Sequence, residues 1–209
     1  MVPTRRLAHV VHLGEDVGEL NEWYRKVFGV EGFMGWPQRH YLESERRFAS
    51  MFMVGDLCVE TMAPALPPDS STAVGRAFAR RGAHLYSVAY LVDDLAGESD
   101  RLTAAGVRVG GPGARFFVPS PRDMAGVRIE FLDVVIAGER HPNTGPLSTA
   151  RLSHLTVGVD DPGAAVDRFV DLLDAARETP ARVRLGDTVI EFAAEASITL
   201  AVADLEGVR

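Results

Sequence analysis

The chain has 209 residues, of which 46% are hydrophobic and 24% charged, and its formal net charge is -7. This composition is typical of a globular protein with a sizeable core, and the negative charge argues against nucleic acid or a membrane surface as a partner. The single cysteine, Cys58, excludes an intramolecular disulfide, and the lack of a signal peptide or long apolar run predicts a cytoplasmic protein.

The same pattern of a strand followed by a helix occurs three times along the chain. The passages are AHVVHLGEDVGELNEWYRKVFGV from Ala8, YSVAYLVDDLAGESDRLTAAGV from Tyr86 and SHLTVGVDDPGAAVDRFVDLLDA from Ser153. In each, an apolar run rich in β-branched residues predicts a strand, an aspartate supplies a helix N-cap, and helical periodicity follows. The alignment places His9, Ser87 and His154 at one shared position.

A second repeated element is a strand that carries one glutamate and follows a glycine turn. It reads GDLCVETMAP, GVRIEFLD and GDTVIEFAA in the three copies, and its glutamates are Glu60, Glu130 and Glu191. Each copy, which we call a module, therefore predicts a strand, a helix and two or three further strands. Module three is the shortest, with room for about two strands after its helix, and SITLAVADL from Ser197 resembles the start of a fourth module.

Glycine and proline divide the chain into two predicted domains. A single module exposes one face of its sheet and cannot bury that face alone, so modules one and two, residues 1–138, are expected to pair. The segment AGERHPNTGPLSTA contains the predicted linker, residues 139–150, and a partial third module occupies residues 151–209. The segment APALPPDSSTAVG is expected to be a loop between modules one and two.

The chain resembles the vicinal oxygen chelate superfamily through the motifs HVVHLGEDVGELNEWYRKVFG, VGDLCVETMAP, LYSVAYLVDDLAGESDRLTAAGV and AGVRIEFLD. This superfamily includes glyoxalase I, methylmalonyl-CoA epimerase, extradiol dioxygenases and bleomycin-binding proteins. The resemblance implies an α+β fold in which paired βαβββ modules form an open, cup-shaped mixed sheet around a cavity, with a shortened third module. It does not define the reaction, because this scaffold hosts lyases, epimerases, transferases, oxygenases and simple binders.

The first strand carries two histidines on opposite faces. Alternate residues of a strand face opposite sides of the sheet, so His9 and Val11 share one face and His12 lies on the other. The resemblance implies that the His9 face lines the cup and that the His12 face lies under the helix. The predicted cavity lining consists of small or apolar residues, namely Val11, Cys58, Ser87 and Ala89.

The resemblance also implies a metal site built from the first and last strands of the paired modules. Carried over residue by residue, the ligand positions are His9, Glu60, Ser87 and Glu130. One imidazole and two carboxylates suit a divalent ion such as Zn, Ni, Mn, Co or Fe. Serine is a poor ligand, and metal-dependent relatives commonly have histidine there, so the predicted ligands are His9, Glu60 and Glu130, with one position open.

Two functions of different classes agree with these residues. In the first, the ion binds adjacent oxygens of a small carbonyl or 2-oxo compound, Glu130 or Glu60 moves a proton, and the cation stabilises an enediolate, as in a glyoxalase or epimerase. In the second, the cup is metal-free and sequesters a small organic molecule, as drug-binding members of the superfamily do. Ser87 favours the second function, whereas His9 with both glutamates favours the enzyme.

Module three has its own histidine and glutamate, His154 and Glu191, which are predicted to be structural or vestigial because no complete fourth module pairs with them. An unpaired module would expose an apolar surface and open strand edges. It could pack on the paired modules, or two chains could pair their third modules about a two-fold axis. The glycine and proline in the linker favour the second arrangement, so the sequence predicts a homodimer.

Overall fold

The computed structural model describes residues 4–34, 40–113, 115–134 and 146–201, which form two compact units. Unit 1 holds residues 4–8, 87–134 and 153–199, and unit 2 holds residues 9–86, 146–152 and 200–201. Most of the predicted linker at 139–150 lies outside the described residues. Among the helices that the structure describes, none is both long and apolar enough to cross a membrane.

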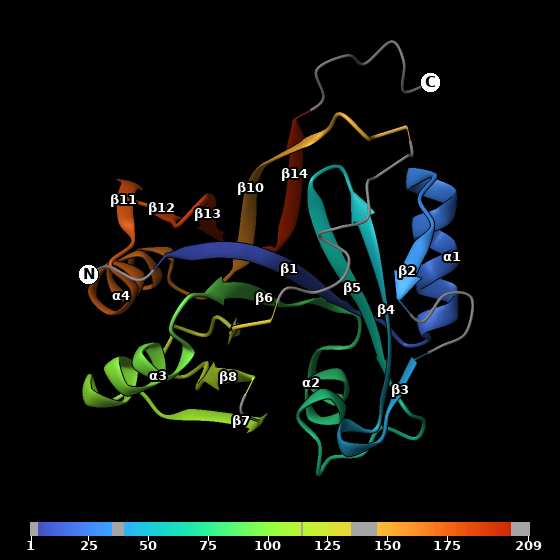
Figure 1. Ribbon diagram of the computed structural model, residues 1–209, viewed down its shortest axis with the longest axis horizontal. Coiled ribbons are helices and arrows are strands. Elements are labelled where there is room, and N and C mark those ends of the chain that lie inside the picture. The colour runs from blue at the N-terminus through green and yellow to red at the C-terminus, as the bar shows by residue number, and fades with distance from the viewer. Residues whose placement is uncertain (1–3, 35–39, 114, 135–145, 202–209) are drawn as a thin grey trace. The chain divides into compact units, whose positions relative to one another are not determined.

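Module one supplies most of unit 2 (Figure 1). Its elements are β1 (Arg5–Leu13), α1 (Val17–Phe28), β2 (Gly32–Met34), β3 (His40–Leu42), the 3-10 helix η1 (Glu43–Glu45), β4 (Arg47–Val54) and β5 (Leu57–Pro64), and α2 (Ala73–Arg81) follows. The strands lie in the order β2-β4-β5-β1, and β3 also pairs with β4. β1 runs parallel to β5, whereas β4 and β5 form an antiparallel hairpin. The sheet is therefore mixed.

Helix α1 covers one face of this sheet and is capped at both ends. Asp16 accepts hydrogen bonds from backbone N–H groups of the first turn, and Gly29 ends the helix with a φ of 63°, which favours glycine. The ring of Tyr24 stacks on Phe52 of β4 with centroids 5.5 Å apart. His12 lies on this face too, because its Nδ1 is hydrogen-bonded to the hydroxyl of Tyr24 at 3.0 Å. The predicted position of His12 under the helix is therefore confirmed.

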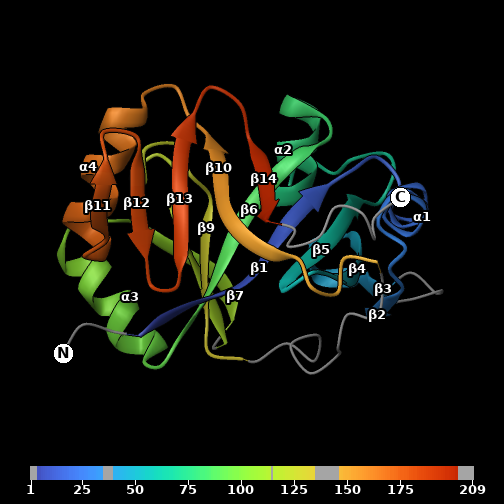
Figure 2. The same ribbon diagram turned by 90° about the horizontal axis from the view of Figure 1, so that it is seen from above.

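Modules two and three supply most of unit 1 (Figure 2). Their elements are β6 (His84–Val92), α3 (Leu95–Ala104), β7 (Val109–Gly113), β8 (Phe116–Pro119), β9 (Ile129–Leu132), β10 (Arg151–Gly158), α4 (Pro162–Leu173), β11 (Ala176–Thr179), β12 (Arg182–Leu185), β13 (Thr188–Ala193) and β14 (Ser197–Ala201). Among the described strands, β6, β9, β8 and β7 are neighbours in that order in a nine-stranded sheet, and a second, five-stranded sheet has the order β11-β12-β13-β10-β14. Both units combine helices with open mixed sheets, which confirms the predicted α+β class.

Module three is short but contains every element of a βαβββ module. The sequence predicted about two strands after its helix, and the structure has three, β11, β12 and β13. These strands have only four to six residues each, so the module is shortened within its elements and turns. Helix α4 covers one face of its sheet, where the rings of Phe169 and Phe192 lie 5.0 Å apart. Much of the apolar surface of module three is thus buried within unit 1.

Helix α2 occupies part of the segment that the sequence predicted as a loop. It begins where the hydroxyl of Thr72 accepts a hydrogen bond from the N–H of Gly75 at 3.0 Å. Its buried Val74 packs against Leu13 and Met62, on the sheet face opposite α1. The nine residues of α2 are too few, and too closely preceded by proline and serine, to show a clear helical period in the sequence.

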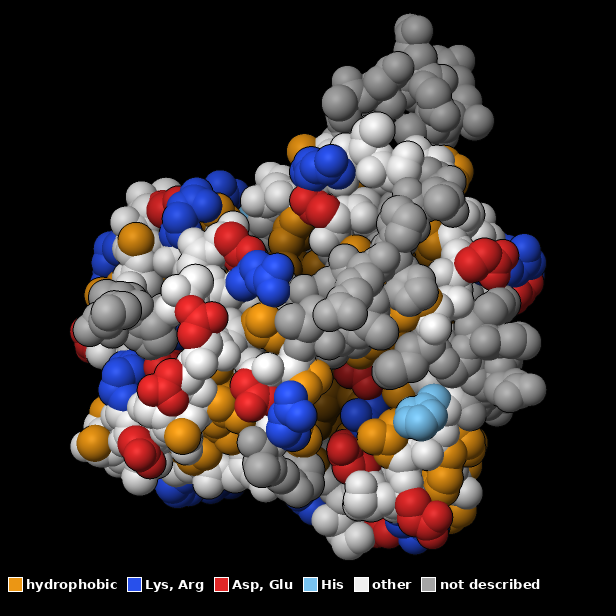
Figure 3. All heavy atoms as spheres, in the orientation of Figure 1, with side chains coloured by type: hydrophobic (Ala, Val, Ile, Leu, Met, Phe, Trp, Pro, Cys, Tyr) orange, Lys and Arg blue, Asp and Glu red, His pale blue; other side chains and the backbone are white. Residues whose placement is uncertain are grey.

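Charged side chains of both signs are mixed on the face of the molecule that Figure 3 shows. Arginine and lysine side chains lie among aspartate and glutamate side chains, and the described residues of this face form no continuous basic patch. This distribution is consistent with the formal charge of -7. The absence of a nucleic-acid partner stays a prediction.

Candidate functional site

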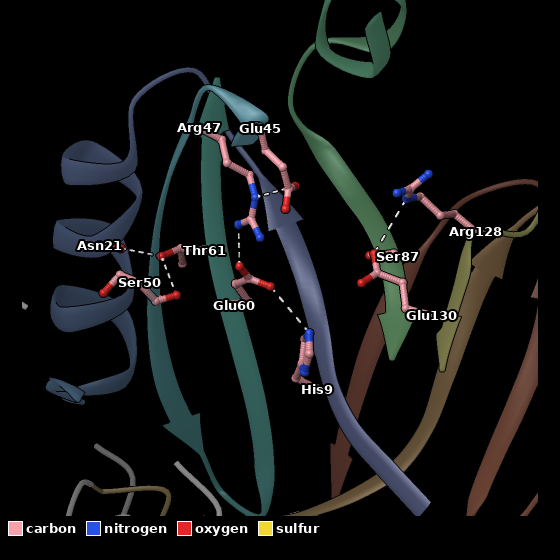
Figure 4. Close-up of polar contacts among 10 residues, drawn as sticks. All are labelled: His9, Asn21, Glu45, Arg47, Ser50, Glu60, Thr61, Ser87, Arg128 and Glu130. Carbon is pink, nitrogen blue, oxygen red and sulfur yellow. Dashed lines mark hydrogen bonds and ion pairs between the residues drawn. The ribbon is translucent and has the colours of Figure 1, made fainter. Parts of the chain in front are cut away.

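In unit 2 the structure brings together His9 on β1 and Glu60 on β5, two of the predicted ligands (Figure 4). Nε2 of His9 lies 3.4 Å from Oε2 of Glu60, and the side chains are only 5% and 9% exposed. The parallel register explains the contact, because Val11 pairs with Glu60 and His9 projects from the same face two residues earlier. Nδ1 of His9 is buried and has no hydrogen-bond partner among the described residues.

Arg47, which the sequence analysis did not identify, completes this cluster. It lies at the start of β4, and its Nη1 donates to Oε1 of Glu60 at 2.5 Å. Its Nε donates to Oε2 of Glu45 at 2.9 Å, so one guanidinium binds two carboxylates. Both oxygens of Glu60 therefore have a neighbour, Arg47 on one side and His9 on the other (Figure 4). We call His9, Glu45, Arg47 and Glu60 the unit 2 cluster.

The carboxyl group of Glu60 is ionised at neutral pH. Burial alone would raise its pKa, but the charge of Arg47 and the contact with His9 outweigh burial and lower the pKa to about 2. Burial disfavours the charge of Arg47 as well, yet its two glutamate partners raise the pKa of the guanidinium. A carboxylate with so low a pKa is a weak base, so Glu60 is better suited to holding charge than to taking a proton.

The unit 2 cluster lies beside buried apolar side chains. On the same face of the sheet, Val11 and Met62 are buried and pack with Val74 of α2. Cys58 is also buried and lies two residues before Glu60, and hence on the same face of β5. Charged and buried apolar side chains therefore share one face of this sheet.

In unit 1 the structure brings together Ser87 on β6 and Glu130 on β9. The hydroxyl of Ser87 donates to Oε1 of Glu130 at 2.8 Å, and Nε of Arg128 lies 3.6 Å from the same oxygen. The register matches that of unit 2, because Ala89 pairs with Glu130. Ser87 and Ala89 are buried, and the serine acts as a hydrogen-bond donor that orients the carboxylate. The His9 pair and the Ser87 pair belong to different units.

Module three repeats the arrangement with a histidine, a glutamate and an arginine. Nε2 of His154 lies 3.4 Å from Oε2 of Glu191, the same separation as in unit 2. Arg182 donates to this oxygen from Nε at 3.1 Å and from Nη2 at 2.6 Å. The side chains of His154 and Glu191 are 18% and 30% exposed, so water screens these contacts more strongly than those of the unit 2 cluster.

Sequence reasoning missed one arginine in each module, namely Arg47, Arg128 and Arg182. Each lies near the glutamate of its module, but at a different distance along the chain, so no repeated motif marks it. The sequence offered only a general reason to expect a partner for each glutamate. A glutamate on a largely buried strand needs a charged or hydrogen-bonding partner, because burying an unpaired charge is costly. This reasoning predicts that a cation is present but does not identify the residue.

The described residues do not fit a divalent-ion site as they stand. Among them, no group of three or more His, Cys, Asp or Glu side chains is arranged to hold a metal ion. Oε1 of Glu60 is bound by Arg47, and Oε1 of Glu130 accepts a hydrogen bond from Ser87. The assignment of His9, Glu60 and Glu130 as ligands stays a prediction, and the arginine on Glu60 argues against it.

Comparison with known proteins defines the family and the fold. Methylmalonyl-CoA epimerase from Mycobacterium tuberculosis is 24% identical, with a TM-score of 0.51 over 60% of this chain and 85% of that chain. A Streptomyces coelicolor methylmalonyl-CoA epimerase variant in complex with 2-nitronate-propionyl-CoA is 22% identical, with a TM-score of 0.52 over 62% and 96%. A hypothetical protein from Bacillus halodurans C-125 is 18% identical, with a TM-score of 0.52 over 61% and 93%.

These structural similarities show the fold, and the family follows from the sequence match. No curated protein matches the chain. The model of the Glyoxalase/Bleomycin resistance protein/Dioxygenase superfamily matches residues 8–117, more than half of the chain, and the match includes His9, Glu60 and Ser87. The protein therefore belongs to the glyoxalase, bleomycin resistance protein and dioxygenase superfamily.

Proposed function

We propose that the protein is an enzyme that moves a proton on the carbon next to a carbonyl group, in a reaction of the epimerase or glyoxalase type. The proposal is carried by the contrast between two glutamates at the same register position. Glu60 is buried and paired with Arg47 through a 2.5 Å contact, whereas Glu130 is 19% exposed and its ion pair with Arg128 has a distance of 3.6 Å. Glu130 is therefore the carboxylate that a substrate can reach more easily.

Glu130 is the proposed general base. Ser87 binds one carboxylate oxygen and so fixes the orientation of the group, while the other oxygen can take the proton. Glu60 is assigned the role of a fixed negative charge, because its contacts with Arg47 and His9 keep its carboxyl group ionised. No step of the proposed reaction is routed through a metal ion.

Methylmalonyl-CoA is the first compound to test, because the solved structures that share this fold include an epimerase in complex with methylmalonyl-CoA. The carbon between its two carbonyl groups is acidic, so removal of its proton can be followed without knowing the final product. In deuterium oxide the enzyme should exchange this hydrogen for deuterium faster than buffer does, as measured by mass spectrometry. A small panel of 2-oxo acids and hemithioacetals would extend the test to the glyoxalase class.

Glu130→Gln is the decisive variant. It keeps the shape of the side chain but removes the base, so exchange should fall by about 100-fold or more while the circular dichroism spectrum stays unchanged. Glu191→Gln is the matched control, because Glu191 has the corresponding position in module three, and it should retain activity. If Glu130→Gln keeps full activity, the proposal is abandoned.

The second candidate function is a metal-free protein that sequesters a small organic molecule. Ser87 favours it, because serine is a poor metal ligand at a position where metal-dependent relatives commonly have histidine. This function predicts tight binding of an apolar or aromatic compound with no turnover and no effect of Glu130→Gln. A fluorescence or calorimetric screen, run beside the exchange assay, separates the two functions.

The homodimer and the cytoplasmic location predicted from the sequence belong to the same proposal. The case for the dimer is weaker than the sequence suggested, because α4 covers one face of the module three sheet. The opposite face carries the polar side chains of His154, Arg182 and Glu191. Sedimentation velocity of the full chain measures the oligomeric state directly.

A further inference from the structure

The unit 2 cluster contains a permanent positive charge bound to a carboxylate that the family resemblance assigns to a divalent ion. The guanidinium of Arg47 cannot lose its proton in a protein, and its side chain is only 13% exposed. Two carboxylates, those of Glu45 and Glu60, hold it in place from two directions. It is therefore a fixed feature of the cluster, and its charge acts on any ligand or ion that approaches Glu60.

Spacing alone would accept a metal ion beside His9 and Glu60. With bonds of about 2.0–2.1 Å and tetrahedral angles, two ligand atoms of one zinc ion lie roughly 3.3 Å apart. The observed distance between Nε2 of His9 and Oε2 of Glu60 is 3.4 Å. What opposes binding is charge, because the ion would lie close to the Arg47 guanidinium on a carboxylate that this guanidinium already neutralises.

We infer that Arg47 takes the place of a divalent ion in unit 2: it neutralises Glu60, disfavours metal binding by His9 and Glu60, and offers its remaining N–H donors to an anionic oxygen of the ligand. Its Nε and Nη1 bind the two glutamates, and no described residue accepts a hydrogen bond from Nη2. The ligand class is a small carboxylate or an enolate oxygen, which a planar guanidinium recognises well. This last part rests on the proposed function, whereas the effect on metal binding does not.

Metal titration tests the inference without an activity assay. Zinc and cobalt are titrated calorimetrically into tag-free protein, for the natural chain and for Arg47→Gln and Arg47→Lys. Glutamine can still donate a hydrogen bond to Glu60 but carries no charge, so Arg47→Gln should bind the ions at least about tenfold more tightly. Lysine keeps the charge, so Arg47→Lys should show no such gain.

Two further variants identify the site that is gained. Adding Glu60→Gln to Arg47→Gln should abolish the gain, because it removes the ligand that Arg47 had occupied. Arg46→Gln is the matched control, since the neighbouring Arg46 pairs with Asp69 on the surface and not with Glu60. It should leave metal affinity unchanged.

The inference is overturned if the natural chain binds the ions as tightly as Arg47→Gln does, or if Arg47→Gln gains nothing while it remains folded by circular dichroism. If Arg47→Gln does not fold, the inference is tested by comparing the metal affinity of the natural chain with that of Glu60→Gln. Tight metal binding that is lost in Glu60→Gln contradicts the inference, and weak binding that is equal in both supports it.

Malonate, titrated in the presence of a chelator, tests the anion-binding part. Its affinity should fall about fivefold or more in Arg47→Gln and less in Arg47→Lys, because lysine keeps the charge but loses the planar pair of donors. Equal malonate affinity in all three proteins would refute this part and leave the metal part standing. Failure of the proposed reaction would change neither titration, so the two proposals fail separately.

Discussion

At the scale of single residues, strand alternation made part of the site predictable. The shared register places the first-strand residue and the glutamate of each module on one face, so the pairs His9 and Glu60, Ser87 and Glu130, and His154 and Glu191 are in contact. These pairs follow from a period of two residues, which any single strand displays. The arginines could not be predicted in this way, because a long flexible side chain can reach a neighbouring strand from several starting positions.

Glu60→Gln should lower stability in a way that depends on pH. The pKa of Glu60 in the folded protein is about 2, below the ordinary value of 4.5, so its ion pairs stabilise the fold fully above about pH 4.5. This stabilisation is lost as the pH falls from 4.5 towards 2. Urea unfolding should therefore show a loss of about 3 kcal/mol at pH 7 and a much smaller loss near pH 3.

Glu191→Gln is the control for this measurement, because Glu191 has the same register position but a more exposed side chain. Its effect on the free energy of unfolding should stay within about 1 kcal/mol. A loss for Glu60→Gln that is equal at pH 3 and pH 7 would show that the charge of Glu60 contributes nothing and that only its packing matters.

At the scale of elements, long capped helices could be predicted from the sequence, whereas short helices and strands could not. Helix α1 has a cap at each end and clear apolar periodicity, and it appears where the sequence predicted it. Helix α2 is short and follows a proline-rich segment, and strands β11 and β12 have four residues each. Elements of this length carry too few residues to display a period, so their position depends on tertiary packing.

The C-terminal end of α4 shows how strongly tertiary contacts contribute in unit 1. The Arg5 guanidinium donates to the carbonyl oxygen of Leu173 at 2.6 Å and to Oε1 of Glu98 at 2.8 Å. Arg101 donates to the carbonyl oxygen of Leu172 at 2.5 Å and also binds Glu98. Two arginines thus satisfy carbonyl groups that a helix end leaves unpaired and oppose the negative end of the helix dipole.

Arg5→Met should therefore destabilise unit 1. The substitution removes one of the two arginines that bind the buried carboxylate of Glu98, leaving Arg101, and it also removes a donor from the end of α4. We expect a loss of about 3 kcal/mol in urea unfolding. Arg115→Met is the matched control in the same unit, because its ion pair with Asp133 is exposed, and it should cost less than about 1 kcal/mol. Equal effects of the two substitutions would contradict the role of Arg5.

At the scale of the whole molecule, contacts between segments far apart in the chain leave no pattern in the sequence. The repeats suggested that modules one and two pair and that module three stands apart, and this domain division stays a prediction. Contacts among the described residues group most of module two with most of module three and with the start of β1. The residues responsible are far apart in the chain, as Arg5 and Leu173 are, so no local pattern records their contact.

Removing module three should disrupt unit 1. A chain that ends at residue 137 lacks the carbonyl partners of Arg5 and Arg101, and it also lacks Asp187, which accepts a hydrogen bond from the N–H of Leu7 at 3.0 Å. These donors would lose their acceptors within the chain, and the apolar surface that module three covers would be exposed to water. We therefore expect the truncated chain to melt at least about 10 °C lower than the full chain and to bind a hydrophobic dye.

Sedimentation velocity of both chains separates this effect from dimerisation. If module three serves only to pair two chains, the full chain will sediment as a dimer and the truncated chain as a monomer with an unchanged melting temperature. That result would contradict a core shared by modules two and three and support the dimer predicted from the sequence. If the shared core matters as the structure indicates, the melting temperature falls whether the full chain is a monomer or a dimer, because the hydrogen bonds that truncation removes lie within one chain.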